Sequence, residues 1–497
     1  MMRESGILLP ISSLPSQYGI GCFSKEAYEF VDQLALANQK YWQILPLGPT
    51  SYGDSPYQSF STYAGNPYFI DLNTLIEEGV LTKKECNLAD FGSDSRFIDY
   101  GKLYKARYKL LRKAYERSNI SQNPEFQTFQ EENAWWLDDY SLFMAVKGFF
   151  QDECWDKWPE DIKKRYGYAL DYYREQLYFE VEFQKYMQFE FSIQWKKLKT
   201  YANENGIRII GDIPIYVAYD SADTWAHPEL FQLDEENVPL AVAGCPPDGF
   251  AADGQLWGNP LYRWDYHRQT GYAWWIQRLS YAFYLYDVVR IDHFRGFDEY
   301  FSIPYGDTTA RNGHWEKGPG IELFHRMKEV LGERDVIAED LGYVTDSVRQ
   351  MVFESGFPGM KVFEFAFDSR DTGCAGDYLP HNYPVNSVVY TGTHDNATLI
   401  GWYQDIPKEG REMLRDYIHD YTTSDRSLHW SVICRVMGSP ARICMIPMQD
   451  YLGLDNTCRI NTPSTLGTNW KWRLLDGEFT SDLQNKIKKL VRIYQRN

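Results

Sequence analysis

Three short apolar segments in this chain each run into an acidic residue, and this pattern limits the possible folds more than any other. The segments are residues 288–292, 335–339 and 388–395. Each reads as a buried β-strand followed directly by a carboxylate. In a parallel barrel the carboxyl ends of all strands meet at one mouth, where barrel enzymes carry their chemistry. The pattern therefore predicts a parallel barrel with three acids at its mouth, a set that could act on a glycosidic bond.

Eight segments have the length and apolar character of buried strands, and helical patterns separate several of them. Strands that alternate with helices are typical of βα units and a parallel sheet. We therefore expect the α/β class, a (β/α)8 barrel with inserted subdomains on the C-terminal face of the strands. The predicted strands are residues 6–10, 41–46, 207–213, 288–291, 336–338, 361–365, 387–390 and 442–447.

The spacing of these strands predicts one catalytic domain over residues 1–497 with three insertions. The gaps after the second and third strands are too long for simple βα units, which need about 30 residues. We expect a mainly helical subdomain over residues 65–170 and an active-site loop subdomain over residues 214–270. A further helical insertion is expected over residues 396–440, after the seventh strand.

The net charge and the aromatic content of the chain indicate which classes of molecule it could bind. The net charge of -18 argues against a nucleic-acid backbone or an anionic membrane as a partner. A neutral sugar fits this balance better. The chain contains 16 Trp, 38 Tyr and 28 Phe, and aromatic faces can stack on the apolar faces of sugars while their polar edges hydrogen-bond. Most of these aromatic residues are still expected to belong to the core.

The spacing of the cysteines and the lengths of the apolar segments predict the cellular compartment in which the protein works. Eight cysteines are scattered without a C-x-x-C pair, which is typical of free thiols in a reducing compartment. The opening apolar run is too short for a signal peptide, and no segment approaches the roughly 20 apolar residues of a membrane span. We expect a soluble cytoplasmic protein, as a monomer or a small homo-oligomer.

The segment around Asp292 carries the first candidate group. Side chains alternate along a strand, so Arg290 and Asp292 share one face. Arg290 would keep Asp292 ionised and oriented, as a carboxylate nucleophile must be. An ion pair with a purely structural role on the floor of the barrel explains the same two residues equally well, so the segment alone leaves both interpretations open.

Two further strand ends supply carboxyl groups. Burial of Glu339 would raise its pKa so that it could donate a proton near neutral pH, whereas Asp340 is expected to be a helix N-cap or a loop ligand. His394 and Asp395 could bind sugar hydroxyls, or Asp395 could cap a helix that begins near residue 396. Asp212 ends the third strand and is expected to support the site from beneath.

Taken together, these segments resemble the four short motifs of the α-amylase superfamily, in order and on the third, fourth, fifth and seventh strands. They are most similar to one branch, the 4-α-glucanotransferases, also called amylomaltases or disproportionating enzymes. The resemblance covers about residues 5–475 and includes four further motifs, at residues 51–59, 64–68, 246–260 and 469–473. One position departs from the pattern, because Ser464 stands where the family has Gly.

The resemblance implies roles for individual residues. Asp292 would be the nucleophile, Glu339 the general acid/base and Asp395 the stabiliser of the transition state. Trp257 would line the acceptor side under a lid formed by residues 245–259, favouring a sugar over water as acceptor. The substrate-binding residues that it implies are Arg290, His394, Asp212, Tyr57, Trp257, Asp248, Asn461 and Tyr52.

The expected activity is transfer of α-1,4-glucan segments between maltodextrins with retention, through a covalent glycosyl-enzyme intermediate. Donors would be maltooligosaccharides, amylose or glycogen-derived dextrins, and glucose could serve as acceptor. Three alternatives are an α-glucan hydrolase, a metal-dependent hydrolase that uses His293 and His394, and a glucan-binding protein without activity. No phosphate-binding glycine-rich loop is present, and we expect neither a cofactor nor a metal.

Overall fold

The computed structural model describes residues 3–51, 53–247, 252–342, 344–367 and 375–497. Eight parallel strands close into a barrel in the order β1-β12-β11-β10-β9-β6-β3-β2. This confirms the predicted (β/α)8 barrel. The strands are β1 (Glu4–Leu8), β2 (Tyr41–Gln43), β3 (Arg208–Ile213), β6 (Val288–Ile291), β9 (Val336–Ala338), β10 (Gly359–Val362), β11 (Ser387–Tyr390) and β12 (Ile443–Pro447).

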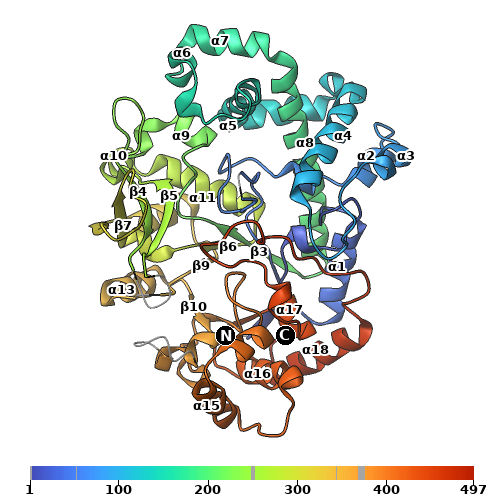
Figure 1. The fold of residues 1–497 in the computed structure, drawn as a ribbon, viewed down its shortest axis with the longest axis vertical. Helices are drawn as coiled ribbons and strands as arrows, with labels where there is room; N and C mark the ends of the chain where they lie inside the picture. Colours follow the sequence, from blue (N-terminus) through green and yellow to red (C-terminus); the bar gives the residue numbers. More distant parts are fainter. Residues whose placement is uncertain (1–2, 52, 248–251, 343, 368–374) are drawn as a thin grey trace.

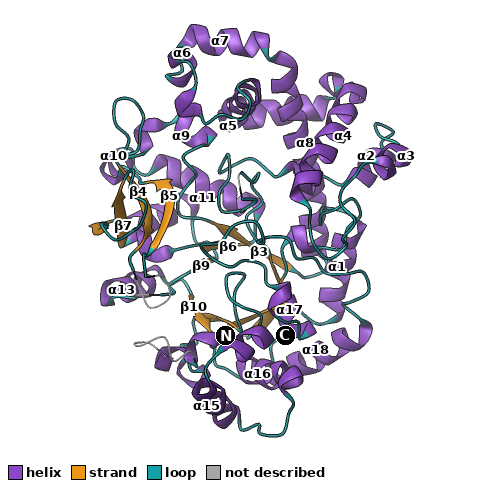
Figure 2. Cartoon of the chain, in the orientation of Figure 1, coloured by secondary structure: helices purple, strands orange, loops and turns teal. Residues whose placement is uncertain are grey.

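The barrel strands are mostly apolar because helices cover the outside and side chains fill the inside, with Asp212 in β3 and Arg290 in β6 among the exceptions. All four residues of β6 and all four of β11 are buried. Helices surround the strands in Figure 2. The barrel helices are α1 (Lys25–Leu36), α8 (Tyr178–Glu204), α11 (Ala273–Leu285), α12 (Glu322–Leu331), α13 (Asp346–Ser355), α16 (Leu428–Met437) and α18 (Ser481–Tyr494).

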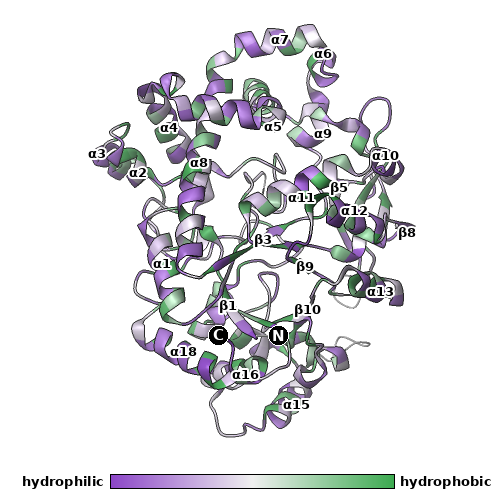
Figure 3. Cartoon of the chain, turned by 180° about the vertical axis from the view of Figure 1, so that it is seen from behind, coloured by the Kyte–Doolittle hydropathy of each residue, from purple (hydrophilic) through white to green (hydrophobic). Residues whose placement is uncertain are grey.

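The outer helices are amphipathic. In α18, Ile487 and Val491 are buried at helical spacing, and the helix packs against α1 and α16. Figure 3 shows hydrophilic and hydrophobic residues mixed along α15 and α18, as expected for helices with one face on the core. Thr480 begins α18 by accepting a hydrogen bond from the backbone N–H of Leu483.

The chain between β2 and β3 forms a helical layer beside the barrel (Figure 1). Its aromatic residues Trp136, Phe143, Trp155 and Trp158 form a buried cluster together with Trp225, which follows β3 in the sequence. The predicted boundary at residues 65–170 remains a prediction. Before α8, this segment contains α2 (Leu72–Glu77), α3 (Lys83–Leu88), α4 (Tyr100–Ser118), α5 (Pro124–Phe149), α6 (Glu160–Lys163) and α7 (Gly167–Gln176).

A second sheet, which the sequence did not predict, lies outside the barrel. It is antiparallel, in the order β5-β4-β7-β8, and joins the segment expected to be a loop over residues 214–270 to the chain that follows β6. Its strands are β4 (Ala241–Cys245), β5 (Gln255–Pro260), β7 (Glu299–Pro304) and β8 (His314–Lys317), and the same region holds α9 (Ala222–Ala226) and α10 (Trp264–Gln269).

The segment between β11 and β12 is helical, although the predicted range of residues 396–440 is not itself tested. It contains α14 (Leu399–Asp405) and α15 (Lys408–Ile418) before α16, and α17 (Met448–Leu452) follows β12. Among the described residues, no helix has both the length and the apolar composition that a membrane span requires. The seven cysteines that the structure describes are free thiols.

Candidate active site

Asp292 and Glu339 lie side by side at the mouth of the barrel. Ile291 of β6 pairs with Ala338 of β9, so the next residue of each strand is one of the two acids. The backbone N–H of Glu339 donates to the carbonyl of Ile291 at 3.1 Å, which extends the ladder to the acids. Because neighbouring strands lie about 4.8 Å apart, the two carboxyl groups start from adjacent positions on the same rim.

Backbone N–H groups fix the carboxylate of Glu339. Its Oε2 accepts from the N–H of His293 at 2.6 Å, and its Oε1 accepts from the N–H of Leu341 at 3.0 Å. Burial, and then the charge of Asp292, raise the pKa of Glu339 to about 7, although Arg290 and these two N–H groups oppose the rise. Glu339 can therefore carry a proton near neutral pH.

Arg290 links two carboxylates. Its Nη1 lies 2.5 Å from Oδ2 of Asp212 and its Nη2 lies 3.0 Å from Oδ1 of Asp292. Asp212 is fully buried, whereas the side chain of Asp292 is 28% exposed, so Asp212 lies on the floor and Asp292 faces the cleft. Burial raises the pKa of Asp292 to about 6, while the charge of Arg290 acts to lower it. Arg290 therefore favours the ionised form of the carboxyl that lies beside it.

Asp395 follows β11 and is held by two side chains. The amide Nδ2 of Asn461 donates to its Oδ1 at 2.6 Å, and Nε2 of His394 lies 3.2 Å from its Oδ2. Burial acts to raise the pKa of Asp395, but the charge and hydrogen bond of His394, together with Asn461, hold it well below its ordinary value. Asp395 does not cap a helix, since Thr398 is the N-cap of α14.

Aromatic rings form one wall beside these acids. Tyr57 donates its hydroxyl to Oδ2 of Asp212 at 2.8 Å, and its ring stacks on His394 at 5.2 Å with an interplanar angle of 14°. The ring of Trp470 lies 5.9 Å from that of Tyr57 and 6.1 Å from that of His394. Trp470 was not among the predicted site residues, although it falls within one of the matching motifs.

The small sheet supplies a second wall. Trp257 lies on β5, and its ring meets the ring of His293 edge to face at 4.8 Å. The indole N–H of Trp257 donates to the side chain of Gln255 at 3.0 Å, which fixes the ring plane. His293 has φ of 53°, a left-handed conformation that turns its backbone N–H toward Glu339. Nothing in the sequence pattern signalled this turn.

The structure also bears on the predictions made for Asp340, Asp248, Tyr52 and a metal site. Asp340 caps no helix, because Thr345 is the N-cap of α13. Its carboxylate instead accepts from the N–H of Met360 in β10 at 2.7 Å, which joins the chain after β9 to the neighbouring strand. Asp248 and Tyr52 lie outside the described residues, so their predicted roles stay predictions. Among the described residues, no three His, Cys, Asp or Glu side chains are grouped as a metal site would need.

Ser464, which departs from the family pattern, has φ of 62°. Glycine adopts this left-handed conformation freely, whereas other residues pay about 1–2 kcal/mol for it. A glycine, which the resemblance leads one to expect here, would adopt this backbone conformation without that cost.

The parallel barrel carries three carboxylates at its strand ends, beside a buried arginine and aromatic walls. This arrangement is typical of barrel enzymes that act on carbohydrates. The model of the 4-alpha-glucanotransferase family matches residues 9–478. The chain belongs to this family and is an enzyme of this activity, which confirms the resemblance drawn from the sequence.

The matches to known relatives extend over nearly the whole chain. A 4-alpha-glucanotransferase from Clostridium butyricum is 50% identical over 488 residues, which span 98% of this chain and 99% of the relative. One from Thermus thermophilus is 45% identical and covers 99% of each chain. The solved structure of amylomaltase from Streptococcus agalactiae in complex with acarbose has a TM-score of 0.96 at 41% identity and covers 100% of both chains.

Proposed function

We propose that this chain transfers α-1,4-glucan segments from one maltodextrin to the 4-hydroxyl of another glucan or of glucose, by a retaining double displacement. The observation that carries the proposal is the pairing of Asp292 and Glu339 on adjacent strand ends, with the guanidinium of Arg290 beside Asp292. A retaining mechanism needs its two carboxyl groups about 5–5.5 Å apart, a separation that neighbouring strands favour.

In the first step, Asp292 attacks the anomeric carbon while Glu339 donates its proton to the glycosidic oxygen. The bond between the anomeric carbon and this oxygen breaks, and the leaving glucan departs with a new hydroxyl. The donor segment remains bound to Asp292 as an ester. Arg290 supports this step by holding the attacking carboxylate at 3.0 Å and favouring its ionised form.

Asp395 acts on the sugar at the reacting position. Its low pKa keeps it ionised, and its side chain is 43% exposed toward the cleft, so it can accept hydrogen bonds from sugar hydroxyls. Asn461 and His394 hold it rigidly. A carboxylate fixed in advance stabilises the positive charge that develops on the sugar ring without reorganising during the reaction.

In the second step, Glu339 accepts the proton of the incoming hydroxyl, which attacks the ester and releases Asp292. Trp257 and His293 form the wall that favours a sugar as this acceptor. A sugar stacked on such a wall displaces water from the ester, so transfer prevails over hydrolysis. The substrates are maltooligosaccharides, amylose or glycogen-derived dextrins, and the free thiols of the described cysteines support a reducing, cytoplasmic setting.

Incubation with maltotriose alone tests this proposal. Nuclear magnetic resonance of the early products should show glucose together with oligomers longer than maltotriose, with every new linkage in the α configuration. Asp292→Asn should abolish both products. A new linkage in the β configuration would contradict retention, and maltose and glucose without longer oligomers would indicate hydrolysis instead of transfer.

A further inference from the structure

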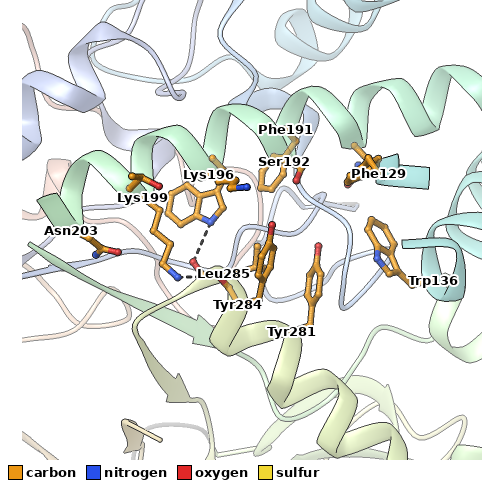
Figure 4. A pocket seen from close by; sticks show the side chains of 13 residues that line it. Phe129, Trp136, Phe191, Ser192, Lys196, Lys199, Asn203, Tyr281, Tyr284 and Leu285 are labelled. Carbon is orange, nitrogen blue, oxygen red and sulfur yellow. Dashed lines mark hydrogen bonds between the residues drawn. The ribbon is translucent and has the colours of Figure 1, made fainter. Parts of the chain in front are cut away.

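A groove lies on the outer side of the barrel between α8 and α11, with α5 at one end (Figure 4). It has a volume of about 240 Å³. Its lining follows α8 from Gln188 to Asn203, a stretch of about 22 Å at 1.5 Å per residue. Figure 4 shows Tyr281 and Tyr284 standing on α11 and pointing toward α8. None of the proposed catalytic acids lines this groove.

The groove is separate from the reaction site but backs onto it. Phe191, Tyr281 and Leu285 line the groove and also line an inner cavity of about 60 Å³. The wall of that inner cavity includes Tyr57 and Asp212, which lie beneath the proposed site of transfer. A ligand in the groove would therefore lie outside this wall, without contact to the catalytic carboxylates.

The lining combines ring faces with free hydroxyl groups. Trp136, Phe191 and Trp195 form a buried apolar floor, and the accessible ring surface comes from the half-buried Phe129 and Tyr281 and from the exposed Tyr284. Within the described part of the chain, no residue hydrogen-bonds the side-chain hydroxyl of Thr200 or Tyr284, and Tyr284 is 57% exposed. An aromatic surface with a few polar groups at its edge suits a pyranose, which has apolar faces and a rim of hydroxyls.

The charges of the groove favour a neutral ligand. Lys199 is already engaged, since its Nζ donates to the carbonyl of Tyr284 at 2.9 Å and lies 3.6 Å from Oδ1 of Asp287. Lys196 has no ion-pair partner among the described residues, so its ammonium group is available to bind an anion. A single exposed lysine on a chain of net charge -18 is a weak site for an anion.

We propose that this groove binds a segment of an α-1,4-glucan chain, as a second site apart from the cleft. The inference rests on the proposed function only in taking an α-glucan as the substrate. A long glucan held in the groove stays near the enzyme, which raises the effective concentration of its free ends at the cleft. Affinity and turnover should then rise with glucan length beyond what the cleft alone provides.

Isothermal titration with maltoheptaose tests for the second site. In the Glu339→Gln variant, which lacks the proposed acid, we expect two binding events per chain. Adding Tyr284→Ala should leave one, and so should Thr200→Trp, which fills the groove from an exposed position on α8. Tyr168→Ala is the matched control, because Tyr168 is an exposed tyrosine on α7 with 67% exposure and lies outside the groove.

Kinetics provide a second readout in the otherwise unaltered enzyme. Tyr284→Ala should lower kcat/KM for amylose about threefold to tenfold, the worth of one aromatic contact, and should leave kcat/KM for maltotriose unchanged. A single binding event in the Glu339→Gln variant would overturn the inference, as would an equal effect of Tyr284→Ala on both substrates.

Two further outcomes separate the possible failures. Binding of inorganic phosphate that competes with maltoheptaose at the second site would overturn the glucan assignment in favour of an anion. Continued formation of longer oligomers by the Glu339→Gln variant would overturn the proposed mechanism. In that case the kinetics of Tyr284→Ala would test the second site on their own. An unchanged kcat/KM for amylose would then overturn the second site.

Discussion

The backbone N–H of His293 donates a 2.6 Å hydrogen bond to Oε2 of Glu339, which ties the end of one barrel strand to the end of the next. His293 directly follows Asp292, so this bond fixes the position of the proposed acid relative to the proposed nucleophile. The left-handed conformation of His293 makes the bond possible. The main chain thus fixes the carboxylate of Glu339, while the buried side chain of Arg290 holds that of Asp292.

The pH dependence of transfer should follow this pair. Activity needs Asp292 ionised and Glu339 protonated, so it should rise as the first proton leaves the pair and fall as the second leaves. With pKa values of about 6 for Asp292 and about 7 for Glu339, kcat/KM for maltotriose should be bell-shaped with limbs near these values. A profile that stays flat from pH 5 to pH 8 would contradict the assignment.

Arg290 should be essential for stability as well as for transfer. Arg290→Met leaves the buried carboxylate of Asp212 without its cation, and breaking a buried pair costs about 3–5 kcal/mol. The acid limb of the pH profile should also move to higher pH, because Arg290 acts to lower the pKa of Asp292. Urea unfolding and the pH dependence of residual activity would measure the two effects.

A surface ion pair provides the control for this variant. Arg208 and Asp335 are in contact at 2.5 Å, but their side chains are 39% and 50% exposed. Arg208→Met should therefore cost less than about 1 kcal/mol. Equal losses of stability in the two variants would show that the buried network has no special energetic role.

Trp257 should control the choice between transfer and hydrolysis. Trp257→Ala removes the ring that packs on His293 and should lower the ratio of longer oligomers to free glucose about threefold to tenfold, by exposing the ester to water. Leu256→Ala is the matched control, because neighbouring residues of a strand face opposite sides. Product ratios from maltotriose measure the effect, and equal ratios in the two variants would contradict it.

Glu190 should make the fold sensitive to alkaline pH. It is 4% exposed in α8, and burial, followed by the charge of Glu78, raises its pKa to about 8. Because the folded pKa exceeds the unfolded value near 4.5, its contribution to stability is complete below pH 4.5 and is lost as the pH rises through 8. The loss is at most about 5 kcal/mol, at 1.36 kcal/mol per pKa unit.

Glu190→Gln should remove this dependence. The variant should gain Tm relative to the parent at pH 8.5 and gain less or nothing at pH 5, as measured by thermal unfolding at both values. Glu204→Gln, at an exposed position near the end of the same helix, should change Tm little at either pH. A gain for Glu190→Gln of equal size at both pH values would contradict the assignment.

The barrel strands could be predicted from the sequence because each is a short, mostly apolar run that ends at polar residues. The bounds of β6, β9 and β11 agree with the prediction. The predicted strand at residues 361–365 starts two residues late and ends three residues late, because β10 spans Gly359–Val362. A Cβ at Gly359 would lie 2.5 Å from Oδ2 of Asp340, so this glycine is required by a tertiary contact that no local pattern reveals.

Other features depend on contacts between distant segments. In the small sheet, β4 pairs with β7, which lies beyond β6 in the sequence. The backbone hydrogen bonds between these two strands therefore join distant segments, which a local sequence pattern does not reveal. The acids were visible as strand ends, and their separate roles came from the family resemblance. The stacking of Tyr57 on His394 and the turn at His293 arise only when the barrel closes.

The central claim is that Asp292 forms a covalent bond to the donor sugar while Glu339 handles the protons. Maltosyl fluoride tests it in the Glu339→Gln variant, because fluoride leaves without a proton whereas release of the sugar still needs a base. Mass spectrometry of the protein should show one added maltosyl group, and the labelled peptide should contain Asp292. An unlabelled protein, or a label on Asp395 or Asp212, would contradict the account.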